Sequence, residues 1–128
     1  MTHISEQEFE ELVSQALDSL PEKYVSRINN VAIVTENNPS PEQRQKLHLH
    51  NGNLLFGLYE GIPLTQRGNN YTFVVPDKIT IFKDPIESVS HNHEDLKERV
   101  RHTLWHEIAH FFGLGHDAIY KRDGTTKN

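Results

Sequence analysis

The sequence contains no cysteine. Disulfide bonds and cysteine-ligated zinc are therefore excluded, which leaves histidine and carboxylate side chains as possible zinc ligands. No apolar run approaches the length of a membrane span, and the polar, acidic N-terminus lacks the apolar core of a signal peptide. We therefore expect a cytoplasmic protein that does not bind membranes.

The chain also has no excess of positive charge. Its 128 residues carry a formal net charge of -5, and 24% of them are charged. This balance disfavours binding to nucleic acid or to an anionic membrane surface. The length predicts one domain, residues 1–128, that buries roughly two-thirds of the surface its unfolded chain exposes. The sequence leaves the oligomeric state open.

Histidine, by contrast, is abundant, with nine residues, and three of them lie in one string near the C-terminus. From His106 to His116 the chain reads H-E-I-A-H-F-F-G-L-G-H, which is H-E-x-x-H-x-x-G-x-x-H. On a helix each residue advances about 100°, so His106 and His110 differ by only about 40° and point the same way. Glu107 lies about 60° from His110, near enough to reach a water at the metal without being a ligand.

The third ligand follows a predicted turn. Gly113 suits the end of the helix, where a positive φ turns the chain sharply and brings His116 back beneath the metal. Three nitrogen ligands and one open position describe a catalytic zinc site. If the turn is one residue longer, Asp117 binds instead. We favour His116 and expect Asp117 to orient a ligand.

Chance is the competing explanation for this string. A bare H-E-x-x-H occurs in many unrelated proteins, but the glycine and the third histidine also fall at the required offsets. Together they make chance agreement roughly a few hundred times rarer.

The string is similar to the signature of the metzincin zinc peptidases, in which a methionine turn follows. Met1 is the only methionine here, so that turn is absent. The chain resembles more closely the small bacterial zincin-like metallopeptidases, which are single-domain proteins with this string near the C-terminus. The resemblance runs from about Leu54 to Asp117.

This resemblance implies a zinc peptidase that acts on a peptide or protein substrate. Glu107 would be the catalytic general base, and Zn²⁺ would be bound by His106, His110 and His116. Upstream, Gly57–Arg67 and Pro76–Phe82 look like the family's strand segments. By the same resemblance, the edge strand that pairs with an extended substrate is assigned to residues 78–83.

The remaining patterns predict an α+β fold. A capping box at Ser5 and Glu8 begins an N-terminal helix that Pro21 stops. A second helix begins at Asn92 or His93 and carries the string, and its apolar stripe should face the core: Leu96, Val100, Leu104, Ile108 and Phe111. Pro39 begins a loop. Strands are expected at residues 31–34, 54–59, 71–75 and 78–82. We therefore predict a minimal single-domain zincin-like fold, a small mixed sheet with an N-terminal helix and a C-terminal active-site helix.

Other histidines leave two interpretations open. His48 and His50 could form a second metal site, but an exposed or hydrogen-bonded pair is favoured. His102 lies one turn before His106 and could support a ligand, although a solvated side chain is the simpler interpretation. For Tyr120 a packing role is favoured over donation to the reacting oxygen.

Two other functions fit the same ligands. One is a zinc-dependent hydrolase of a non-peptide amide, because the ligands alone do not determine the substrate. The other is a non-catalytic, zinc-stabilised binding module. Glu107 argues against the second function, since a structural site has no need of a base at that position.

Overall fold

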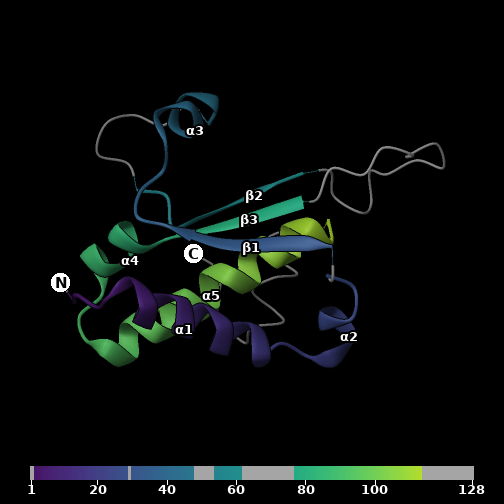
Figure 1. The fold of residues 1–128 in the computed structure, drawn as a ribbon, viewed down its shortest axis with the longest axis horizontal. Coiled ribbons are helices and arrows are strands. Elements are labelled where there is room, and N and C mark those ends of the chain that lie inside the picture. The colour runs from purple at the N-terminus through teal and green to yellow at the C-terminus, as the bar shows by residue number, and fades with distance from the viewer. Residues whose placement is uncertain (1, 29, 48–53, 62–76, 114–128) are drawn as a thin grey trace.

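The computed structural model describes residues 2–28, 30–47, 54–61 and 77–113, and Figure 1 shows how their elements are arranged. Along these residues the order is α1 (Glu6–Asp18), α2 (Glu22–Val25), β1 (Val31–Glu36), α3 (Pro41–Lys46), β2 (Gly57–Glu60), β3 (Asp77–Phe82), α4 (Lys83–Val89) and α5 (His93–Phe111). Helices and a small sheet in this order confirm the predicted α+β class.

The sheet is mixed and has the strand order β1-β3-β2. β1 runs parallel to β3, with Val31 opposite Asp77, and β2 runs antiparallel to β3, with Gly57 opposite Ile81. β3 therefore lies in the centre of the sheet, and the edge strand expected at residues 78–83 was wrong. Its near-continuous apolar run, Ile79–Phe82, is fully buried, as a central strand requires. Among the strands of the described residues, β2 lies at the edge of the sheet, and it contacts α5.

One face of the sheet is covered by the two long helices. α1 and α5 contact each other, and α5 also contacts β2 and β3 (Figure 1). Residues two apart on a strand share a face, so Ile79 and Ile81 both project toward these helices. On α5 the predicted apolar stripe is confirmed, because each of its members is at most 3% exposed: Leu96, Val100, Leu104, Ile108 and Phe111.

The helix starts follow capping chemistry. Ser5 and Glu8 form the predicted capping box of α1, and the Asn92 side chain caps α5 by accepting a hydrogen bond from the Asp95 N–H in its first turn at 2.8 Å. The short helix α3 was not predicted, since the sequence indicated only a loop there. It buries no residue and is stabilised instead by a second capping box, at Ser40 and Gln43, with proline in its first turn.

A second unpredicted helix, α4, follows β3 directly and packs against α5. Ile86, in this helix, is fully buried. Of the helices in the described ranges, none has the length and apolar character needed to cross a membrane. The strand expected at residues 71–75 lies outside the described residues.

Candidate metal centre

Helix α5 determines where the side chains of the string point. The indole N–H of Trp105 donates to the carbonyl of Ala16 in α1 at 3.4 Å, which links the two helices beside the site. The helix ends at Phe111, and the N–H of Gly113 donates to the carbonyl of His110 at 2.9 Å. Gly113 has a φ of 78°, so the predicted glycine turn is confirmed.

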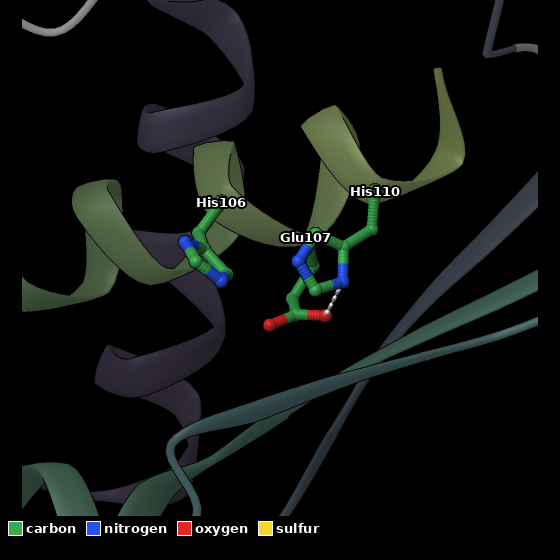
Figure 2. A group of neighbouring side chains, drawn as sticks. All are labelled: His106, Glu107 and His110. Carbon is green, nitrogen blue, oxygen red and sulfur yellow. Dashed lines mark ion pairs between the residues drawn. The ribbon is translucent and has the colours of Figure 1, made fainter. Parts of the chain in front are cut away.

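Three side chains of the string converge on one side of α5, as Figure 2 shows. His106, Glu107 and His110 each offer a ligand atom, and these atoms all lie within 4.8 Å of one another. The two imidazole rings have centroids 4.6 Å apart. Glu107 Oε1 lies 3.8 Å from Nδ1 of His110. The predicted i, i+4 pairing of the two histidines is therefore present, with the carboxylate beside it.

This donor set fits zinc. Nitrogen ligands bind tetrahedral Zn²⁺ at about 2.0–2.1 Å, which places them about 3.3 Å apart. The separations of the donor atoms at His106 and His110 are compatible with that distance after small side-chain rotations. Both histidines are half-buried and therefore reachable from solvent, whereas Glu107 is only 7% exposed. The two imidazoles thus keep contact with solvent, while the carboxylate is held in a drier position.

Burial also changes the proton affinity of Glu107. Removal from water raises the pKa of this carboxyl to about 7, although a hydrogen bond from the backbone N–H of Tyr59 acts in the opposite direction. A bound cation would lower the pKa as well, since an opposite charge favours the carboxylate. The Tyr59 N–H also fixes where the carboxylate lies, because a backbone donor in a strand has little freedom to move.

Gly57 allows β2 to approach α5 this closely. A Cβ at this position would lie 2.7 Å from Cγ2 of Thr103 and 3.2 Å from Cγ of Glu107. No real Cβ tolerates the first distance, so a side chain here would push the edge strand away from the helix. The sequence signal was available, because an isolated glycine within a strand marks close backbone approach.

Tyr59 is anchored through its side chain as well as through the sheet. Its hydroxyl donates to Oδ2 of the buried Asp77 at 3.1 Å, and its ring packs edge-on against Phe111 with centroids 6.0 Å apart. These contacts connect the end of β2, the start of β3 and the last turn of α5. Nothing in the sequence patterns indicated that Tyr59 would contact Glu107.

The other histidines of interest are placed differently. His102 has its ring centroid 6.4 Å from that of His106, one turn back along α5, and it is partly buried. Among the described residues it is not one of the three whose donor atoms cluster. His116, the predicted third ligand, lies outside the described residues, as do Asp117, Tyr120, His48 and His50.

Residues 28–125 match the zincin-like metallopeptidase family, and this range includes the whole H-E-x-x-H-x-x-G-x-x-H string. The chain belongs to the zincin-like metallopeptidase family. The predicted resemblance is thereby confirmed for more than half of the chain, and the family implies a metal, typically zinc.

One solved structure is similar in fold to this chain. A conserved hypothetical protein of T. thermophilus matches with a TM-score of 0.56 and 21% sequence identity, over 93% of this chain and 100% of that one. At this identity the likeness concerns the fold alone. No curated protein matches the chain.

Proposed function

We propose that this zincin-like protein is a zinc-dependent peptidase, with Zn²⁺ bound by His106, His110 and His116 and with Glu107 as the general base. One observation carries the proposal more than any other. A buried carboxylate lies beside two imidazoles one helical turn apart, with all three groups of donor atoms within 4.8 Å. Zinc bound at such a site activates water and polarises the carbonyl under attack.

The chain's own residues have distinct roles in this proposal. The imidazoles of His106 and His110 hold the cation from one rigid helix face, so binding needs little ordering of the backbone. Glu107 is held by the Tyr59 N–H and lies close to both rings, where its carboxylate takes a proton from the attacking water and returns it to the leaving amine.

The substrate strand is β2 in this proposal, rather than β3. Just before β2, the carbonyl of Phe56 accepts the Phe82 N–H of β3 at 2.8 Å, so the backbone groups of Phe56 and of Leu58, two residues on, point toward β3. By the alternation of strands, Gly57 and Tyr59 direct theirs to the outer edge, where Tyr59 reaches Glu107. An extended peptide that adds to this edge would pair with the backbone of Gly57, since the Tyr59 N–H already donates to Glu107, and would lie beside the candidate metal centre.

The two alternatives predict different behaviour in solution. A zinc-dependent hydrolase of a non-peptide amide uses the same residues on another substrate, and a binding module uses zinc only for stability. The buried position of Glu107 favours an enzyme over a module, because placing an unneeded carboxyl in an apolar setting costs stability.

Substrate panels separate the three functions. The zinc-loaded protein is incubated with a peptide library and with a panel of non-peptide amides, then stripped with a chelator and reloaded with zinc. We expect peptide cleavage that disappears on chelation and returns with zinc. Cleavage of non-peptide amides alone would indicate the other hydrolase. No turnover of either panel, combined with stable zinc binding, would indicate a binding module.

A further inference from the structure

A cleft of about 530 Å³ opens directly from the candidate metal centre. His106 and Glu107 lie at one end, and from there the cleft follows α5 back toward Asp95 near the start of that helix. Its opposite wall is the segment 54–57 that leads into β2. This volume lies within the range of sites that bind small molecules.

The wall opposite the helix is apolar. Leu54, Leu55 and Phe56 line it, and the fully buried Ile86 of α4 closes it from behind. Leu54 is 50% exposed, and among the described residues only Leu47 is also a large, exposed hydrophobic side chain. Covering this exposed apolar surface with an apolar ligand group is favourable, because it removes the surface from water.

The charged side chains along the helix wall are paired with one another. Asp95 accepts from Nε of Arg99 at 3.2 Å, and Glu98 pairs with Arg101, whose guanidinium also lies over the Trp105 ring at 4.9 Å. A charged substrate side chain entering the cleft would lose hydration, and these acids and bases already bind each other. An uncharged side chain meets no such cost.

We propose that this cleft is a substrate subsite that selects an uncharged, apolar side chain, of the size of leucine, methionine or phenylalanine. Leu54 is its specificity-determining residue, since it is the most exposed part of the apolar wall. The inference rests on the proposed peptidase function and deepens it by naming the substrate class. The partner recognised is a peptide with such a residue next to the cleaved bond.

The test uses the zinc-loaded full chain and a peptide library in which one position at a time is fixed as Leu, Met, Phe, Ala, Asp or Lys. We expect kcat/KM to be at least about tenfold higher for the large apolar residues than for Ala, Asp or Lys at one position beside the cleaved bond. Leu54→Asp should remove this preference, and Leu54→Ala should reduce it. Leu47→Asp, which changes the other exposed leucine, should leave it intact.

Binding gives a second readout. Zinc-loaded Glu107→Gln should bind the best apolar peptide at least about tenfold more tightly than its aspartate counterpart, and adding Leu54→Asp should abolish the difference. Turnover without an apolar preference, or equal effects of Leu54→Asp and Leu47→Asp, would overturn the subsite and leave the peptidase function standing. No turnover of any library peptide would overturn the peptidase function, and the subsite with it.

Discussion

Replacing Gly57 with alanine tests how closely β2 must approach α5. The new Cβ would lie 2.7 Å from Cγ2 of Thr103, 3.2 Å from Cγ of Glu107 and 3.3 Å from the carbonyl oxygen of Thr80. Thr103 is buried, so the atoms packed around it leave its methyl group little room to move aside. Overpacking of this kind costs about 1–3 kcal/mol.

Thermal unfolding of the Gly57→Ala variant measures this cost. For a domain of this size 1 kcal/mol corresponds to roughly 3–6 °C, so a cost of about 1–3 kcal/mol lowers the Tm by about 3–18 °C. Reduced backbone entropy of the unfolded chain offsets about 0.4–1 kcal/mol of this loss. Because β2 moves away from Glu107, hydrolytic activity should fall as well.

A double-mutant cycle identifies the clash. Thr103→Ala removes the Cγ2 methyl group that the new Cβ would meet first. Gly57→Ala should therefore cost at least about 1 kcal/mol less in the Thr103→Ala background than in the wild type. Additive effects of the two substitutions, or a Gly57→Ala variant as stable as the wild type, would refute the close approach of strand and helix.

Three further predictions concern pH and the third ligand. Burial raises the pKa of Glu107 from 4.5 to about 7, so between these pH values the folded, chelator-treated protein holds more protons than the unfolded chain. Its free energy of unfolding should therefore fall by up to about 3 kcal/mol as pH rises through that window. Chemical denaturation measures this slope, and Glu107→Gln should remove it. Burial raises the pKa of Glu87, but hydrogen bonds from the Ile4 N–H and from Lys83 and His3 outweigh this and leave the pKa below 4.5. The free energy of unfolding should therefore fall as pH drops below about 4.5, and this loss should be smaller in the Glu87→Gln variant. Zinc titration should show that His116→Ala lowers zinc affinity by orders of magnitude and Asp117→Ala by roughly 10- to 100-fold, and the reverse order would make Asp117 the third ligand.

The local features of the site could be predicted from the sequence. The apolar stripe of α5, the pairing of His106 with His110 and the turn at Gly113 each depend on residues within one or two helical turns. The periodicity of a helix determines such relations almost completely, so a sequence pattern is sufficient. The capping box at Ser5 was equally local and equally readable.

The order of the strands could not be predicted in the same way. β3 has charged residues near both of its ends, Lys78 and Lys83, which is typical of an edge strand, yet it lies between β1 and β2. Strand order depends on pairing between segments that are far apart in the sequence, such as Val31 with Asp77. The link from Tyr59 to Glu107 depends on that order, so it was not visible from the sequence either.

The most direct test of the central claim is a single comparison between Glu107→Gln and Glu94→Gln. Both substitutions neutralise a glutamate of α5, but Glu94 is exposed in the first turn, far along the helix from His106. Zinc content and peptide kcat/KM are measured on the same samples. Both variants should bind zinc as the wild type does, and only Glu107→Gln should lose activity, by at least about 10² to 10⁴-fold. A Glu107→Gln protein that retains zinc and cleaves peptides at the wild-type rate would contradict the account.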